Sequence, residues 1–189
     1  MTKIRTFVAI PIYGLSTLEK WMDYLKGLDL PGRIKWNDSG QWHLTLKFIG
    51  DVEETEFDRL IISLQGHLAD CFAGDVTFQG TGFFGSRDNP KVLWVGTRDS
   101  EWLKGLKEMV EQGVSVLDLP YDGCPFRPHL TIARIKSLKE TSLLFEETDK
   151  KKNITWGVQA VKEVVLYRSR LTSDGPVYSV IERFELKSE

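Results

Sequence analysis

The chain has 189 residues, of which 41% are hydrophobic and 28% are charged, and its formal net charge is −2. This length and composition predict one globular domain over residues 1–189, with a core of its own. No apolar run approaches the roughly 20 residues of a membrane span. A net charge near zero also excludes a surface built to coat a long polyanion. A nucleic-acid ligand would therefore contact few phosphates, at a local basic site.

The two cysteines and the first residues bear on the cellular location. Cys71 and Cys124 share no metal-binding or redox spacing, so we expect reduced thiols. Residues 1–14 contain a short apolar run without a small-residue cleavage site, which favours a strand over a signal peptide. We therefore expect a cytoplasmic protein.

The hydrophobic periodicity predicts strands and helices in alternation. The expected strands cover residues 4–12, 33–36, 43–49, 75–79, 91–97, 129–135, 158–171 and 177–186. The expected helices cover residues 18–28, 54–70, 102–117 and 138–150. The last two strands would form a closing hairpin over residues 172–176. This order indicates two similar halves, each with a sheet covered by helices, and we find no linker that would separate them.

Two of the three histidines stand in the same tripeptide. The chain reads HLTLKF from residue 43 and HLTIAR from residue 129. Side chains alternate across a strand, so His43 and Thr45 share one face while Leu44 faces the other way. The apolar face can anchor the strand on a helix-covered core, which leaves the polar pair facing a groove.

The second tripeptide repeats this arrangement with His129 and Thr131. Two imidazoles suit phosphodiester cleavage because a pKa near 6.5 allows one neutral and one protonated ring near neutral pH. One ring would take a proton from water and the other would give a proton to the departing oxygen. The threonine hydroxyls could donate hydrogen bonds to the non-bridging oxygens as negative charge grows there. The residues alone leave open which histidine is the acid.

Several residues near the motifs are candidates for substrate binding. Arg134 could contact a phosphate or stack on a base, although strict alternation would put it on the face away from His129. The same alternation would put Lys47 on the His43 face. Phe48 could be a platform for a base, with core packing as the alternative. Arg127 and the run 168–170 could add positive potential near the groove, or could be solvated surface charges.

Other patterns give weaker signals. Residues 80–85 match G-x-G-x-x-G, but another strand follows where a dinucleotide site needs a helix. We therefore expect these glycines in a bent strand or a turn. His67, on a predicted helix, is interpreted as a structural or surface residue. The histidine and cysteine spacings do not support a zinc site, and no carboxylate stands beside His43 or His129.

Taken together, HLTLKFIG and HLTIAR resemble the paired H-x-T-x motifs of the 2H phosphoesterase superfamily. The segments RTFVAIPI and LYRSRLTSDGPVYSVIERFEL are similar to its RNA 2′,3′-cyclic phosphodiesterase branch, also called 2′-5′ RNA ligase. The resemblance covers essentially the whole chain. It implies an α+β fold with two pseudo-twofold-related lobes of mainly antiparallel sheet, outer helices and a central cleft.

The resemblance also implies an activity. RNA 2′,3′-cyclic phosphate ends would be hydrolysed to 2′-phosphomonoesters without metal or other cofactor, and RNA ends could be joined through 2′-5′ linkages. His43 would be the proton donor and His129 the proton acceptor. The partners would be RNA ends or small cyclic nucleotides, with no membrane and no obligate protein partner, so we expect a monomer. Two alternatives stay open: a 2H phosphodiesterase for another cyclic or 2′-5′ nucleotide, and a non-catalytic module that binds RNA ends.

Overall fold

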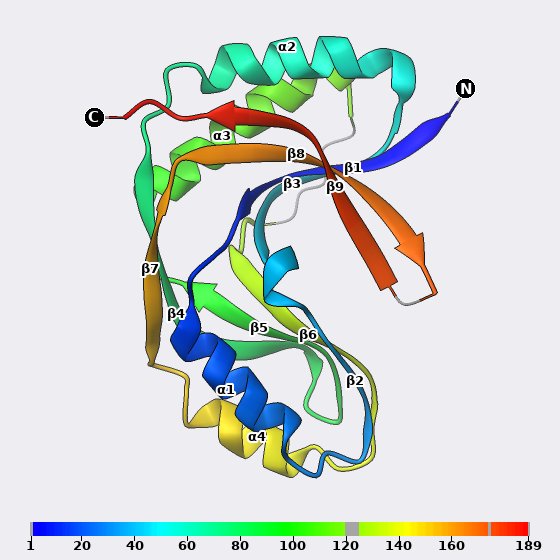
Figure 1. The fold of residues 1–189 in the computed structure, drawn as a ribbon, viewed down its shortest axis with the longest axis vertical. Helices are drawn as coiled ribbons and strands as arrows, with labels where there is room; N and C mark the ends of the chain where they lie inside the picture. Colours follow the sequence, from blue (N-terminus) through cyan, green and yellow to red (C-terminus); the bar gives the residue numbers. More distant parts are fainter. Residues whose placement is uncertain (1, 120–124, 174, 189) are drawn as a thin grey trace.

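The computed structural model describes residues 2–119, 125–173 and 175–188. Its strands and helices follow the expected order, and Figure 1 shows their arrangement. The strands are β1 (Lys3–Pro11), β2 (Gly32–Trp36), β3 (His43–Glu53), β4 (Gly74–Ser86), β5 (Asn89–Thr97), β6 (His129–Leu138), β7 (Thr155–Val161), β8 (Glu163–Thr172) and β9 (Gly175–Glu185). The α-helices are α1 (Ser16–Lys26), α2 (Phe57–Leu68), α3 (Glu101–Val114) and α4 (Ser142–Asp149).

The nine strands of the described residues form one sheet, in the order β7-β4-β5-β6-β3-β1-β8-β9, with β2 paired to β6. All the pairings between named strands are antiparallel. The order is symmetric about its middle, where β6 meets β3. Four strands on one side, together with β2, make one lobe, and the four on the other side make the second, which confirms the bilobal α+β prediction.

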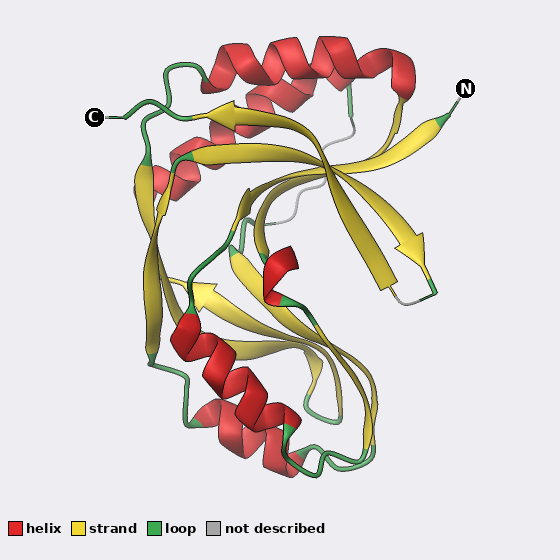
Figure 2. Ribbon diagram, viewed as in Figure 1, coloured by secondary structure: helices red, strands yellow, loops and turns green. Residues whose placement is uncertain are grey.

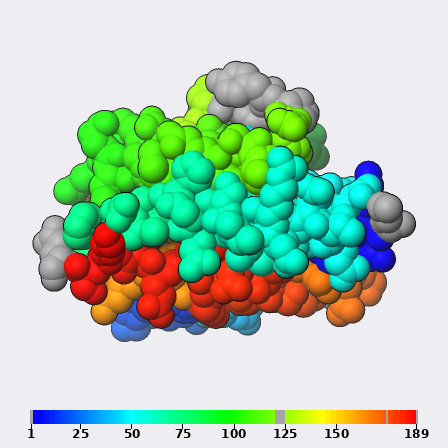
Figure 3. Space-filling view, turned by 90° about the horizontal axis from the view of Figure 1, so that it is seen from above, coloured from blue at the N-terminus to red at the C-terminus, as the bar shows by residue number. Residues whose placement is uncertain are grey.

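Helices cover the outer side of each lobe (Figure 2). Helices α2 and α3 pack against each other and against β9 and β3 in the second lobe, whereas α1 and α4 contact β7 and β4 in the first. Figure 3 shows α2 and α3 side by side on the outer face, with the end of the chain beside α2. Leucines at helical spacing explain this packing: Leu60, Leu64 and Leu68 of α2 are almost fully buried.

The lobes are interleaved in the sequence, because β1 joins the C-terminal strands β8 and β9. The prediction of one strand over residues 158–171 is therefore wrong. The chain leaves β7 at Val161 and enters β8 at Glu163, and these two strands lie in different lobes. Periodicity misses this break because the connecting residue, Lys162, is neither Gly nor Pro.

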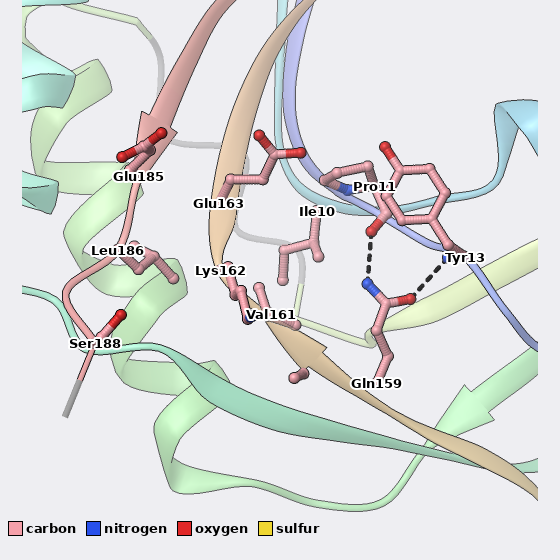
Figure 4. Close-up of a pocket in the computed structure, with 11 residues that line it drawn as sticks. Ile10, Pro11, Tyr13, Gln159, Val161, Lys162, Glu163, Glu185, Leu186 and Ser188 are labelled. Atoms are coloured by element: carbon pink, nitrogen blue, oxygen red, sulfur yellow. Dashed lines mark hydrogen bonds between the residues drawn. The ribbon is translucent and has the colours of Figure 1, made fainter.

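The side chain of Gln159 forms hydrogen bonds that join β7 to the end of β1 and the segment that follows it. Gln159 on β7 donates a hydrogen bond to the Pro11 carbonyl (2.8 Å) and accepts one from the Tyr13 amide (2.7 Å). These residues line a pocket of about 460 Å³ between β1, β7 and the end of the chain (Figure 4). Neither His43 nor His129 lines this pocket.

Two remaining expectations concern glycines and membranes. Residues 80–85 lie within β4 as expected, and Gly80 (φ +70°) and Gly85 (φ +102°) stand at irregularities in its pairing with β5. Among the described residues, no helix combines the length and the apolar character needed to cross a lipid bilayer.

Candidate active site

The two histidine motifs meet at the centre of the sheet. Strands β3 and β6 run antiparallel and share one bridged pair, Leu44 opposite Leu130. Both leucines are fully buried, and they fix the register on the core side. Because side chains alternate, the residues before and after each leucine project from the other face of the sheet.

This register brings the two His-Thr pairs together. Counting outward from the leucine bridge places His43 opposite Thr131 and Thr45 opposite His129. All four side chains are half-buried. The two imidazoles therefore lie diagonally across a pseudo-twofold axis, and each has the threonine of the other motif as its cross-strand neighbour.

Matching hydrogen bonds orient the two imidazoles. Nδ1 of His43 lies 2.8 Å from the Gln41 carbonyl, and Nδ1 of His129 lies 2.7 Å from the Arg127 carbonyl. A carbonyl only accepts, so each Nδ1 carries the proton. Each neutral ring therefore presents an unprotonated Nε2, which can accept a proton and, once charged, return one.

Aromatic side chains surround His43. Its ring centroid lies 5.0 Å from Phe7 and 4.9 Å from Tyr178, the latter edge-on. Phe7 in turn stacks on Tyr167 at 5.1 Å. On the other side of the axis, Phe84 packs edge-on against His129 at 4.8 Å. Packing of this kind limits ring rotation and excludes water from one side of each imidazole.

The pKa of His43 lies below its ordinary value. Burial, which disfavours the charged ring, is the largest cause, and the hydrogen bond to the Gln41 carbonyl offsets it in part. The Arg134 guanidinium and the neighbouring His129 ring lower the pKa of His43 further. His43 is thus mainly neutral at pH 7 in the free protein, and an anionic ligand beside it would raise its pKa again.

A pocket of about 480 Å³ opens beside His43. Its lining includes His43, Thr45, Phe48 and Arg134 from the sequence-predicted set. The structure adds Arg5 and Tyr178, which sequence reasoning missed. Both belong to strands whose neighbours are set by long-range pairing, so no local pattern could place them beside a histidine.

Matching β-bulges explain why Phe48 and Arg134 reach this pocket. The register of β3 against β1 shifts between Thr45 and Lys47, and the register of β6 against β5 shifts between Thr131 and Ala133. Each bulge lies three residues after a histidine and reverses the alternation beyond it. Phe48 and Arg134, each five residues after a histidine, therefore turn onto the histidine face.

These bulges correct two expectations drawn from strict alternation. Arg134 lies on the histidine side, not the opposite one. Lys47 does not line the pocket, and its ammonium group lies 3.2 Å from the Glu111 carboxylate on α3.

The other basic candidates lie away from the pocket lining. Arg127 is exposed, and its carbonyl, not its side chain, contacts the His129 ring. On β8 the pocket is lined by Ser169 and Leu171, so alternation directs the arginines at 168 and 170 to the other face.

Phe48 also lies beneath a cation. The Arg5 guanidinium carbon lies 4.8 Å from the centre of its ring, and the Phe48 side chain is 49% exposed. An exposed aromatic face next to positive charge suits stacking of a nucleobase. The alternative of core packing for Phe48 does not agree with this exposure.

Asn37 holds the second bulge in place. Its Nδ2 donates a hydrogen bond to the Thr131 carbonyl at 2.8 Å, and its backbone amide donates one to the Ile132 carbonyl at 2.9 Å. These carbonyls belong to the bulge in β6 that directs Arg134 to the pocket. Asn37 therefore fixes the backbone between His129 and Arg134.

The third histidine lies away from the other two, and the described carboxylates do not gather around it. His67 is exposed on α2, where its Nδ1 lies 2.8 Å from the Ser63 carbonyl. Within residues 2–119, 125–173 and 175–188, no three His, Cys, Asp or Glu side chains cluster as metal ligands do. Cys124 lies outside the described residues.

Comparisons with known proteins agree with this geometry. The family model of the 2′-5′ RNA ligase superfamily matches residues 37–170. An RNA 2′,3′-cyclic phosphodiesterase of Aquifex aeolicus is 33% identical over 85% of this chain and 86% of its own. One from Methanothermobacter thermautotrophicus is 30% identical over 97% of this chain and its entire length.

Solved structures show the same fold. TT0787 of Thermus thermophilus superposes with a TM-score of 0.79 at 26% identity, covering 98% of this chain and all of its own. Escherichia coli LigT, solved with 3′-AMP, has a TM-score of 0.77 at 22% identity, with 98% and 99% coverage. A chain with both motifs, this fold and these relatives belongs to the 2′-5′ RNA ligase superfamily of 2H phosphoesterases.

Proposed function

We propose that this protein hydrolyses RNA 2′,3′-cyclic phosphate ends to 2′-phosphomonoesters. The observation that carries the proposal is the pair of half-buried His-Thr motifs on either side of the Leu44–Leu130 bridge, each with its Nε2 available. The curated relatives named RNA 2′,3′-cyclic phosphodiesterase support it.

In the proposed mechanism the phosphorus lies between the two imidazoles. His129 takes a proton from a water molecule while the oxygen of that water forms the new bond to phosphorus. His43 gives a proton to the 3′ oxygen as the P–O3′ bond breaks, so that a 3′-hydroxyl and a 2′-phosphomonoester remain. Each proton transfer contributes about 10² to 10⁴ in rate. With an RNA 5′-hydroxyl in place of water as the nucleophile, the same steps would form a 2′-5′ linkage and leave a 3′-hydroxyl.

The lowered pKa of His43 fits this role when the substrate is bound. An imidazolium of low pKa gives up its proton readily, and the anionic phosphate favours the charged form in the complex. Thr45 and Thr131 would donate hydrogen bonds to the non-bridging oxygens. Arg134 would add a fixed positive charge beside them.

The proposed enzyme needs no metal and acts as a cytoplasmic monomer. Incubation with a short RNA that ends in a 2′,3′-cyclic phosphate, followed by ³¹P NMR of the product, tests the reaction. We expect a 2′-phosphate alone, at the same rate with and without EDTA. A 3′-phosphate product, or turnover only of 2′-5′ dinucleotides, would reject the proposed reaction. Loss of activity in EDTA that zinc restores would reject its metal independence.

A further inference from the structure

A second pocket, of about 250 Å³, adjoins the one beside His43. It is bounded by β2 and the segment after it, including Lys35, Trp36 and Gln41, and by the tip of the β8–β9 hairpin. Pro176 and Tyr178 line both pockets. The carbonyl of Gln41 orients His43, so this pocket begins two residues from the imidazole.

Lys35 lines this pocket and has no ion pair with an acidic side chain of the described residues. Its side chain is half-buried, and its ammonium group packs so closely on Gly175 that a Cβ there would clash with it. No hydrogen bond or ion pair joins Lys35 to another described residue. Asp38 also lines the pocket, but its carboxylate accepts the Gly40 amide at 2.8 Å.

The neighbour of Lys35 across the strands is also a cation. Lys35 on β2 pairs in register with Arg134 on β6, so the two side chains project from the same face. Like charges directly opposite each other in an antiparallel pair destabilise the sheet. A ligand with two neighbouring negative charges, bound across both pockets, would offset the repulsion between Lys35 and Arg134.

We propose that this second pocket binds the RNA backbone next to the terminal nucleotide, with Lys35 contacting the phosphodiester on the 5′ side of that nucleotide. The inference rests on the proposed function, because it places the cyclic phosphate at His43 and Arg134. Adjacent phosphates of one strand supply the two negative charges. Trp36 and Val177 line the same pocket and offer apolar contact to a base or sugar. The substrate class is therefore the end of an RNA chain, in preference to a free cyclic nucleotide.

Binding of reaction products tests the inference independently of turnover. A five-residue RNA ending in a 2′-phosphate and the corresponding nucleoside 2′-phosphate are titrated against the wild-type protein and Lys35→Gln. We expect the wild type to bind the RNA more tightly than the mononucleotide. Lys35→Gln should weaken RNA binding roughly 5- to 20-fold, as expected for loss of one charge-assisted contact, with mononucleotide binding unchanged. The RNA salt dependence should become shallower by about 0.7 in log–log slope.

Two variants serve as controls. Lys20→Gln removes the same charge from an exposed position on α1 of the same lobe and should change nothing. Lys35→Arg keeps the charge and should restore most of the RNA affinity. The melting temperature of unliganded Lys35→Gln should be no lower than that of the wild type, because a like-charge contact is relieved.

Three results would overturn the inference: equal wild-type affinity for the RNA and the mononucleotide, equal losses for both ligands in Lys35→Gln, or a similar loss in Lys20→Gln. The proposed function fails separately, if the wild type turns over no 2′,3′-cyclic phosphate while these binding differences are present.

Discussion

The two histidine strands match in backbone over the motif and the first bulge, but they carry different side chains beyond it. Both carry His, Leu and Thr, and both have a bulge three residues after the histidine. At the fifth position after the histidine, however, β3 has the aromatic Phe48 and β6 has the cation Arg134. Both side chains line the pocket on the His43 side. The symmetric part can position the two proton-transfer groups, whereas the asymmetric part determines where and how a nucleotide binds.

The largest effects should come from the symmetric part. His43→Asn and His129→Asn should each lower kcat on a 2′,3′-cyclic substrate by about 10² to 10⁴, because each removes one proton transfer. Steady-state hydrolysis rates measure this loss. His67→Asn is the matched control and should retain full activity, since His67 is exposed on α2. Similar losses in all three variants would mean that the motifs act only through folding.

Substitution in the asymmetric part should affect binding more than chemistry. Arg134→Met should raise KM about 10- to 100-fold, because a contact between a charged group and a phosphate is lost. Its effect on kcat should be smaller. Steady-state kinetics with a cyclic mononucleotide measure the split, and Arg127→Met, an exposed arginine outside the pocket lining, is the control. An equal effect of the two substitutions would contradict the assignment of Arg134.

A smaller effect on KM should follow from removing a hydrogen bond that holds the bulge in β6. Asn37→Ala removes the side-chain donor to the Thr131 carbonyl and should raise KM about 5-fold, the order expected for one hydrogen bond. If Asn37 acts by directing Arg134, its effect should largely disappear in the Arg134→Met background. Additive effects in the double variant would show that Asn37 contributes only to general stability.

The smallest change should be electrostatic. Arg134→Met removes a positive charge that lowers the pKa of His43, so this pKa should rise and the imidazolium should persist to higher pH. It should stay below 6.5, the ordinary value, because burial is the larger cause and is unchanged. NMR titration of the His43 ring measures both values. A wild-type pKa at or above 6.5, or a fall in the variant, would contradict this account.

The sequence predicts the His-Thr pairs that the two strands share, but not the positions of the side chains beyond the bulges. Period-two alternation puts His43 with Thr45 and His129 with Thr131, and the structure has each pair on one face. A bulge three residues after each histidine interrupts the alternation. The sequence does not predict these bulges, because Leu46 and Ile132 are ordinary strand residues. Arg5 and Tyr178 are brought to His43 by pairings among β3, β1, β8 and β9, which no local pattern encodes.

The layout of the lobes shows the same division between local and long-range information. Apolar spacing predicts the helices and most strands, because it reflects which side of each element is buried. The break at Lys162, which sends the chain from one lobe to the other, leaves no mark in composition. The expectation of two similar halves is correct in architecture, and the structure adds that β1 joins the C-terminal strands β8 and β9.

The division of labour between the two imidazoles can be tested directly with a substrate whose 3′ bridging oxygen is replaced by sulfur. A thiolate leaves without a proton, so this substrate needs a general base but no general acid. We expect His43→Asn to hydrolyse the sulfur substrate at close to the wild-type rate, whereas His129→Asn should stay as impaired as on the oxygen substrate. Recovery by His129→Asn alone, or by neither variant, would contradict the roles assigned to the two histidines.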